Sequence, residues 1–420
     1  MEKGLFKNII GYDDVKKTLE RVIDVLNNKN KYEELGCVIP HGLFLYGKPG
    51  LGKSTFAFDI LDIVNRKSYI IRKNKSDGDF INYMNNIFDD AKKNQPSIIL
   101  LDDIDKFALD DDKKNNEEFV AVQSLIDDIK NLDIFVIATA NNKNCLPDSL
   151  LRSGRFDIKI KVDYPTEKDS FKIMKYYLGN KKLDNDVNIK NISYIMGNFS
   201  CADLEKVCNQ AGLYAGFNNK KKIGMDELLR ASLELEYNTT IESSDNDDKY
   251  SLNVSYHEAG HALVGSILEP KSVSFITTLR TNSNTKGITK FHSNDYYFDD
   301  IKYMENRVIS LLAGKAATDI VYNKCDVGTN SDIRMAYDIV SKFVDNYCMF
   351  GFNSWIRDSM EQSEKVKESK DTQINELITK YYNIARELLI KNRDILNTLA
   401  ITLKDKKILF QDEIEDIINN

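Results

Sequence analysis

The segment GKPGLGKS at residues 47–54 constrains this chain more than any other feature, because few backbone structures accommodate it. It has the complete spacing G-x-x-x-x-G-K-[ST], in which glycines let successive backbone N–H groups turn toward phosphate oxygens. An apolar run at 43–46 precedes it and a helical pattern follows, which is the context of a P-loop. Lys53 would then reach the phosphates of ATP, and Ser54 the Mg²⁺. The residues that we expect to bind nucleotide are Gly47, Pro49, Gly50, Gly52, Lys53, Ser54 and Thr55.

Polar side chains follow two further apolar runs. SIILL is followed by Asp102 and Asp103, and IFVIATA is followed by Asn141. Because the carboxyl ends of parallel strands meet at one edge of a sheet, we expect these side chains near the P-loop. We assign Asp102 to Mg²⁺ and Asp103 to the attacking water. Asn141 would orient that water or contact the γ-phosphate.

Hydrophobic patterning divides the 420 residues into parts, and this length suits two or three domains. Apolar strand candidates alternate with helical patterns between 43 and 162, as in a parallel α/β sheet. Helical spacing then takes over, except for a strand-like patch at 273–292, and we expect a loop at 357–371. The predicted parts are an α/β P-loop ATPase subdomain at 1–163, a small helical subdomain at 164–237, a polar linker at 238–250 and a mainly α-helical domain at 251–420.

A second motif, HEAGH, lies in the last of these parts. The chain has four histidines in all, and two of them are here. On a helix the i, i+4 spacing puts His257 and His261 on one face, where both can bind one Zn²⁺. Glu258 lies beside them as a general base for the attacking water. The alternative is a pair of core histidines bonded to backbone partners.

The third zinc ligand is not evident from spacing. A catalytic zinc site commonly takes three protein ligands. The metzincin extension fails, because Val264 replaces its glycine and Ile267 its third histidine. His292, Asp319 and Asp332 are all chemically suited, and the residues alone leave the choice open.

Several longer segments are similar to one known family. They are ELGCVIPHGLFLYGKPGLGKS, IILLDDID, IATANNKNCLPDSLLRSGRFD and FSCADL in the first half, and GKAATDI and GTNSDIRMAYDIV in the second. With these segments the chain resembles the FtsH family of ATP-dependent AAA metalloproteases, from about residue 6 to its end. The resemblance implies a homo-hexameric ring that acts on polypeptides.

The resemblance also implies roles that the residues alone leave open. Arg152 and Arg155 are either structural ion-pair partners or charge stabilisers for phosphoryl transfer. In the family, such arginines reach the nucleotide of the neighbouring subunit. Asp332 would complete the zinc site with the two histidines. Asp319 would fall in the family's acidic pair upstream of it, as a group that supports the ligands, and Thr318 replaces the other acid of that pair.

Three features depart from the family pattern. The residue that positions water is usually Glu, and Asp103 is shorter; a misplacement of about 1 Å can cost about 10²-fold in rate. The pore loop that grips substrate reads KSDGD at 75–79, without its aromatic, so Phe80 and Tyr83 either substitute for it or anchor the next helix. The membrane-spanning region of the family does not occur in these residues, and the initial Met favours a soluble variant over a fragment.

Composition excludes other classes of function. A net charge of −7 provides no overall attraction to nucleic acid or to an anionic membrane. The six cysteines are scattered, which suits a reducing compartment. The apolar runs fall far short of the roughly 20 residues that cross a bilayer. We expect a cytoplasmic location without membrane insertion, while association through a partner stays open.

Together these observations predict an ATP-dependent zinc endopeptidase that degrades unfolded or misfolded polypeptides, with Zn²⁺ and Mg²⁺-ATP as cofactors. One alternative is a remodelling or binding ATPase whose protease half is a scaffold, against which the intact zinc residues argue. The other is a peptidase whose nucleotide module mainly controls assembly. Asp103 and the altered pore loop favour that second alternative.

Overall fold

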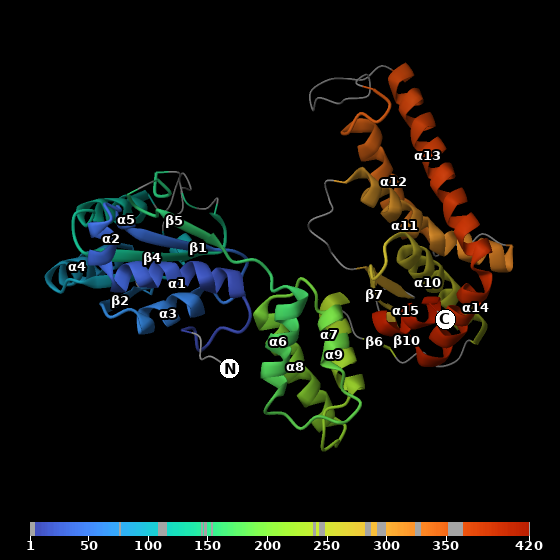
Figure 1. The fold of residues 1–420 in the computed structure, drawn as a ribbon, viewed down its shortest axis with the longest axis horizontal. Coiled ribbons are helices and arrows are strands. Elements are labelled where there is room, and N and C mark those ends of the chain that lie inside the picture. The colour runs from blue at the N-terminus through green and yellow to red at the C-terminus, as the bar shows by residue number, and fades with distance from the viewer. Residues whose placement is uncertain are drawn as a thin grey trace. The chain divides into compact units, whose positions relative to one another are not determined.

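A parallel β-sheet carries the P-loop (Figure 1). Its five strands within the described residues have the order β2-β3-β4-β1-β5. The strands are β1 Gly42–Tyr46, β2 Lys67–Ile71, β3 Ser97–Leu101, β4 Ile134–Ala140 and β5 Ile158–Lys161. The structure is a computed structural model that describes residues 5–74, 77–107, 116–143, 146, 149–152, 154–237, 241–242, 248–281, 287–291, 300–323, 329–351 and 364–419. The predicted parallel α/β sheet is confirmed, and the three quoted apolar runs form β1, β3 and β4.

Helices alternate with these strands and cover the sheet. They are α1 Asp13–Asn27, α2 Lys29–Glu34, α3 Lys53–Ile63, α4 Asp77–Lys93 and α5 Asn116–Asp128, with a 3-10 turn, η1 Ile104–Lys106, directly after β3. Strands β3 and β4 are buried along their whole length, as central strands of a covered parallel sheet should be. Their aliphatic side chains pack with Phe80, Phe88 and Phe107 into the core of this part.

Four helices follow the sheet: α6 Glu167–Leu178, α7 Ile189–Ile195, α8 Cys201–Phe217 and α9 Met225–Tyr237. A capping box starts α8, because the side chains of Ser200 and Asp203 each accept the other's backbone N–H at 3.2 Å. The chain separates into two compact units that divide these helices. One comprises Met1–Ile189 with Asn198–Gly224, and the other Lys190–Gly197 with Met225–Asn420. The boundaries drawn from the sequence therefore stay a prediction.

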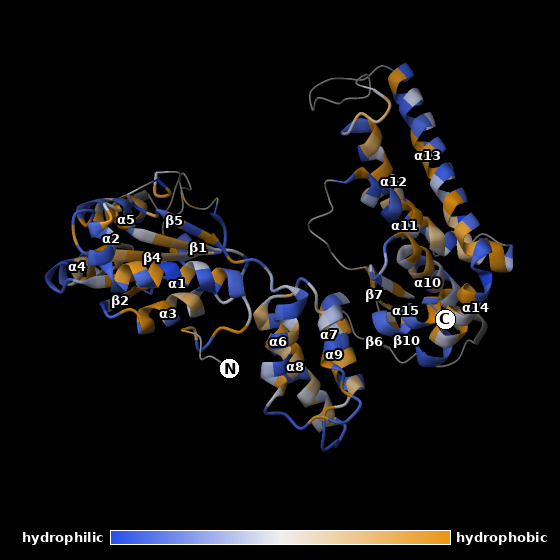
Figure 2. Ribbon diagram, viewed as in Figure 1, coloured by the Kyte–Doolittle hydropathy of each residue, from blue (hydrophilic) through white to orange (hydrophobic). Residues whose placement is uncertain are grey.

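The second unit is mainly helical, as the sequence predicted. Its helices after α9 are α10 Asp248–Leu268, α11 Ile301–Tyr322, α12 Asn330–Asp345, α13 Glu364–Lys391, α14 Arg393–Lys406 and α15 Gln411–Asn419. Helix α10 packs against α11 and α14, and α11 also packs against α13. Figure 2 shows hydrophobic and hydrophilic residues alternating along α13, which is the pattern of a helix with one buried face.

Short strands complete this unit. An antiparallel sheet has the order β10-β7-β9, from Ile408–Phe410, Val273–Thr277 and Ile288–Phe291. The pair β6 Ile241–Glu242 and β8 Arg280–Thr281 forms a second, antiparallel ladder, so the predicted linker contains a strand as well as the start of α10.

The prediction of a loop at 357–371 is wrong for its second part, because α13 begins at Glu364. The first part, 357–363, lies outside the described residues. Across the ranges that the structure describes, no helix combines the length and apolarity needed to span a bilayer.

Candidate nucleotide and zinc sites

The P-loop connects β1 with α3, as its sequence context predicted. Gly47, Pro49, Gly50 and Gly52 lie in the connecting turn, and Lys53, Ser54 and Thr55 form the first turn of α3. The Nζ of Lys53 donates to the carbonyl of Lys48 at 2.8 Å and to Oδ1 of Asn141 at 3.0 Å. Burial lowers the pKa of Lys53. The predicted phosphate-binding lysine thus contacts the residue that directly follows β4.

Asp102 occupies the centre of this site and is only 3% exposed. Its Oδ1 accepts hydrogen bonds of 2.8 Å from Ser54 and from Thr139 on β4. Its Oδ2 accepts a bond of 2.6 Å from Nε of Arg72, the residue after β2. Burial opposes ionisation of this carboxyl, but the bonds from Ser54, Thr139 and Arg72 lower its pKa below the usual value.

Asp103 and Asn141 lie at the same edge of the sheet. Asp103 has a left-handed backbone, with φ of 53°, a region that Asp tolerates better than most residues. Its N–H donates to Oγ1 of Thr139 at 2.9 Å, and its carboxylate pairs with Lys106 at 2.7 Å. The N–H of Asn141 donates to Asp105 at 3.0 Å. The structure therefore brings the P-loop, both acids and the amide together.

The two arginines differ in their surroundings. Arg155 forms a two-pronged ion pair with Asp127, at 2.8 and 2.7 Å, and also donates to the carbonyl of Ser149. The guanidinium lowers the pKa of Asp127 to about 2. Arg152 is exposed. Within one subunit, the geometry of Arg155 is that of a structural ion pair, and a role toward a neighbouring subunit stays a prediction for both.

Phe80 and Tyr83 are anchors of α4 in this structure. Phe80 is fully buried, with its ring centroid 5.1 Å from that of Phe107. The hydroxyl of Tyr83 donates to the carbonyl of Ile70 at 3.3 Å. The first two residues of the predicted pore loop, 75 and 76, lie outside the described residues. Because Phe80 is buried in the core, it anchors the helix and does not substitute for the aromatic of the pore loop.

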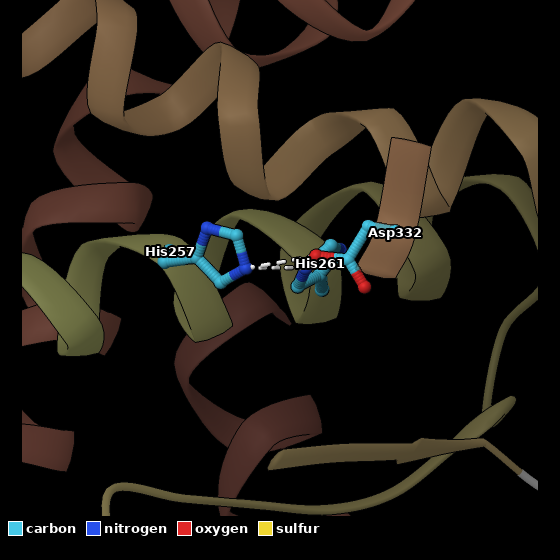
Figure 3. Close-up of side chains that lie close together, drawn as sticks. All are labelled: His257, His261 and Asp332. Carbon is cyan, nitrogen blue, oxygen red and sulfur yellow. Dashed lines mark hydrogen bonds and ion pairs between the residues drawn. The ribbon is translucent and has the colours of Figure 1, made fainter. Parts of the chain in front are cut away.

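The second site brings together the side chains of His257, His261 and Asp332 (Figure 3). The two histidines lie one turn apart on α10, and Asp332 comes from the first turn of α12. Oδ2 of Asp332 is 3.1 Å from Nε2 of His257 and 3.4 Å from Nε2 of His261, and the two Nε2 atoms are 3.0 Å apart. Asp332, one of the three candidates for the third ligand, thus lies within reach of both histidines.

These separations fit a zinc ion. Tetrahedral coordination with bonds of about 2.0 Å places ligand atoms about 3.3 Å apart, close to the three distances observed. Nδ1 of His261 lies 2.7 Å from the carbonyl of Ser310, so this nitrogen carries the proton and Nε2 keeps its lone pair for a metal. Burial opposes ionisation of Asp332, but the two imidazoles beside it lower its pKa far below the usual value.

Gly314 of α11 makes room for the two imidazoles. A Cβ at this position would collide with Nε2 of His261 and lie 2.7 Å from Cε1 of His257. Any other residue would therefore push the rings apart. The GKAATDI segment thus contributes to the site through its glycine.

Glu258 is 5% exposed and faces β9. Oγ1 of Thr289 donates to its Oε2 at 2.6 Å, and a Cβ on Gly287 would lie 2.5 Å from its Oε1. Burial raises the pKa of Glu258 to about 7. A carboxyl with this pKa can both take up and release a proton near neutral pH, which suits a general base.

Two further candidates have different positions. His292 lies outside the described residues. Asp319 accepts hydrogen bonds from Lys315 at 2.8 Å and from Tyr382 of α13 at 2.7 Å, so it joins α11 to α13. The resemblance implied that Asp319 supports the zinc ligands. These contacts do not support that role.

Sequence reasoning missed Arg72, Thr139, Gly287, Thr289, Ser310 and Gly314. Thr139 had a signal, because it lies at the end of an apolar run that a site residue follows. Gly314 belongs to GKAATDI, the segment quoted for Asp319, and the remaining residues belong to no motif. All of them act through contacts between distant segments.

Two family descriptions match the two halves of the chain. Residues 43–164 match the "ATPase family associated with various cellular activities (AAA)", and residues 245–417 match "Peptidase family M41". The fold and both sites therefore define an AAA ATPase joined to a zinc metallopeptidase.

Relatives over nearly the whole chain identify the family. An "ATP-dependent zinc metalloprotease FtsH 1" of Thermoanaerobacter sp. (strain X514) is 30% identical over 99% of this chain and 72% of its own length. The FtsH of Bacillus subtilis (strain 168) is 28% identical, over 99% of this chain and 70% of its own. The chain belongs to the FtsH family of ATP-dependent zinc metalloproteases, whose cofactors are zinc and Mg²⁺-ATP.

Proposed function

We propose that this chain degrades unfolded or misfolded polypeptides in a homo-hexameric ring, using ATP to deliver them to its zinc site. One observation carries the proposal: the buried carboxylate of Glu258 belongs to the same helix as two histidines that meet Asp332 at zinc-ligand spacing. The relatives' names, ATP-dependent zinc metalloprotease, support the dependence on ATP.

The contacts support the following roles in peptide hydrolysis. His257, His261 and Asp332 would hold Zn²⁺, which when bound supplies a Lewis acid that polarises the peptide carbonyl and acidifies water. Glu258 would take the proton from the attacking water and pass it to the leaving amine. Thr289 would keep the carboxylate in place by its hydrogen bond.

The roles in ATP hydrolysis remain proposals as well. Lys53 would bind the phosphates, while Ser54 and Asp102 would hold Mg²⁺. Asp103 would position the water and Asn141 would orient it. Arg152, which is exposed, and Arg155, after release from Asp127, would serve the neighbouring subunit. A cytoplasmic location also stays a proposal, supported by the scattered cysteines.

Unfolded chains are the proposed substrates, because the anchored Phe80 and Tyr83 argue against a strong aromatic grip. A weak grip suits polypeptides that need no forced unfolding. A tightly folded domain would then resist degradation.

Casein, an unfolded substrate, tests the proposal. We expect degradation with ATP, little with a non-hydrolysable analogue, and none with the Glu258→Gln variant. Equal degradation with ATP and analogue would instead support the assembly-switch alternative. Casein survival under every condition would contradict the protease function and favour a remodelling ATPase.

A further inference from the structure

Arg72 is a cation built into the nucleotide site. It directly follows β2, and both Nε and Nη2 of its guanidinium lie 2.6 Å from Oδ2 of Asp102. Its Cζ lies 5.1 Å from the centroid of the Phe58 ring on α3. The carboxylate is buried, whereas the Arg72 side chain is 54% exposed. One side of this ion pair is therefore fixed, and the other can move into solvent.

The hydrogen-bonding capacity of Asp102 is already used. An ionised carboxylate offers about four lone-pair positions. Ser54 and Thr139 donate to Oδ1, and the two Arg72 nitrogens take Oδ2. Any other cation that approaches Asp102, directly or through its water shell, has to share or replace one of these donors. Arg72 is the donor most free to leave, because Ser54 and Thr139 belong to α3 and β4.

We propose that Arg72 competes with Mg²⁺ for Asp102, so that loading of Mg²⁺-ATP releases the guanidinium from the carboxylate. The inference rests on the proposed role of Asp102 in Mg²⁺ binding. Arg72 is a positioning residue in this proposal, since it acts through Asp102. Arginine stays charged at every physiological pH, so the competition is set by the Mg²⁺ concentration.

A supporting role for Arg72 makes the opposite prediction. If the guanidinium only aligned the carboxylate for Mg²⁺, its removal would raise the Mg²⁺ concentration needed for nucleotide binding. If it competes, its removal lowers that concentration. The sign of the change therefore separates the two roles.

The test measures binding of a fluorescent N-methylanthraniloyl ATP to the full chain as Mg²⁺ is titrated. We expect Arg72→Gln to lower the Mg²⁺ midpoint about 5-fold, the size of a partly exposed ion pair. Arg72→Lys keeps the charge without the two-pronged contact, and its midpoint should lie between wild type and Arg72→Gln. Unchanged or raised midpoints in both variants would overturn the proposal.

A matched control removes a positive charge elsewhere on the same strand. Lys67 begins β2 and pairs with Asp90 at 3.3 Å, so Lys67→Gln changes the net charge equally but leaves Asp102 untouched. Its midpoint should equal that of wild type. A drop as large as that of Arg72→Gln would reduce the effect to general electrostatics and overturn the competition.

Asp102→Asn distinguishes failure of this inference from failure of the proposed site. It should raise the Mg²⁺ midpoint, and in its background Arg72→Gln should have no further effect. If Asp102→Asn leaves the midpoint unchanged, the assignment of Asp102 to Mg²⁺ is wrong. If it raises the midpoint but Arg72→Gln acts equally in both backgrounds, only the competition is wrong.

Discussion

Thr289 and Gly287 determine where the carboxylate of Glu258 lies. The hydroxyl of Thr289 bonds one carboxylate oxygen at 2.6 Å, and Gly287 leaves room for the other. Neither residue belongs to HEAGH, yet a general base works only at the correct distance from its proton. At this scale, the zinc site depends on residues outside its motif.

Thr289→Val removes the hydroxyl and keeps the shape of the side chain. We expect kcat for cleavage of a short fluorogenic peptide to fall about 10-fold with KM unchanged, because one hydrogen bond to a carboxylate is lost. Thr289→Ser keeps the hydroxyl and should restore most of the rate. A serine variant as slow as the valine variant would show that the methyl group, and not the hydrogen bond, is important.

Asp103→Glu tests the shortened residue of the ATPase site. The longer side chain would bring the carboxylate nearer the attacking water, and we expect ATP turnover to rise by up to about 10²-fold. Turnover is measured as phosphate release at saturating Mg²⁺-ATP. An unchanged or lower rate would remove Asp103 from the water-positioning role, and its left-handed backbone would then explain the choice of Asp.

Strand β9 links two parts of the second unit. Successive side chains of a strand point to opposite faces. Thr289 accordingly bonds Glu258 of α10, while Lys290 donates to the carbonyl of Ile195 at 2.8 Å and pairs with Glu236 at 2.9 Å. One short strand thus contacts Glu258, the proposed general base, on one face and helices α7 and α9 on the other.

Lys290→Met tests this link. It removes the charge and keeps the aliphatic stem, so we expect the second unit to lose about 2 kcal/mol of unfolding free energy in urea titrations. Peptide cleavage should slow too, because β9 carries Thr289.

Lys190→Met is the matched control. It breaks the pair between α7 and Asp412 of α15, which is 3.1 Å long and has both side chains about half exposed. We expect a change within about 0.5 kcal/mol and unaltered cleavage. If both variants lost the same unfolding free energy and the same cleavage rate, the contacts of Lys290 on β9 would be no more important than an exposed ion pair.

The molecule as a whole has its two chemistries in two compact units. The P-loop, Asp102 and Asn141 lie in the first, and the three proposed zinc ligands lie in the second. These residues come from α10 and α12, which are far apart in sequence, so a bound metal would tie the two helices together.

Removal of zinc should therefore affect one unit only. With 1,10-phenanthroline we expect the calorimetric transition of the second unit to fall by about 10 °C, and that of the first to stay in place. Asp332→Asn weakens the metal site. The second unit of this variant should therefore unfold at a lower temperature even before the chelator is added, and the chelator should change that temperature little. Equal shifts of both transitions would show that the units do not unfold separately.

Short-range patterns in the sequence predict much of the local structure of this protein. The alternation of apolar runs and helical patterns predicted the parallel sheet, and the spacing in GKPGLGKS and HEAGH predicted a phosphate loop and two imidazoles on one helix face. These features follow from short-range backbone geometry, so a few neighbouring residues are enough to specify them. Strand β10, with three residues, was too short for such a pattern.

Spacing along the chain does not predict most contacts between distant side chains, although the family resemblance implied Asp332 and the strand order implied the acids near the P-loop. Asp332 is separated from His257 by 75 residues, yet their ligand atoms lie 3.1 Å apart. Arg155 pairs with Asp127, Arg72 pairs with Asp102, and Phe80 is buried in the core. Sequence spacing contains no information on these contacts, because helix packing and strand order set them and the separation along the chain does not.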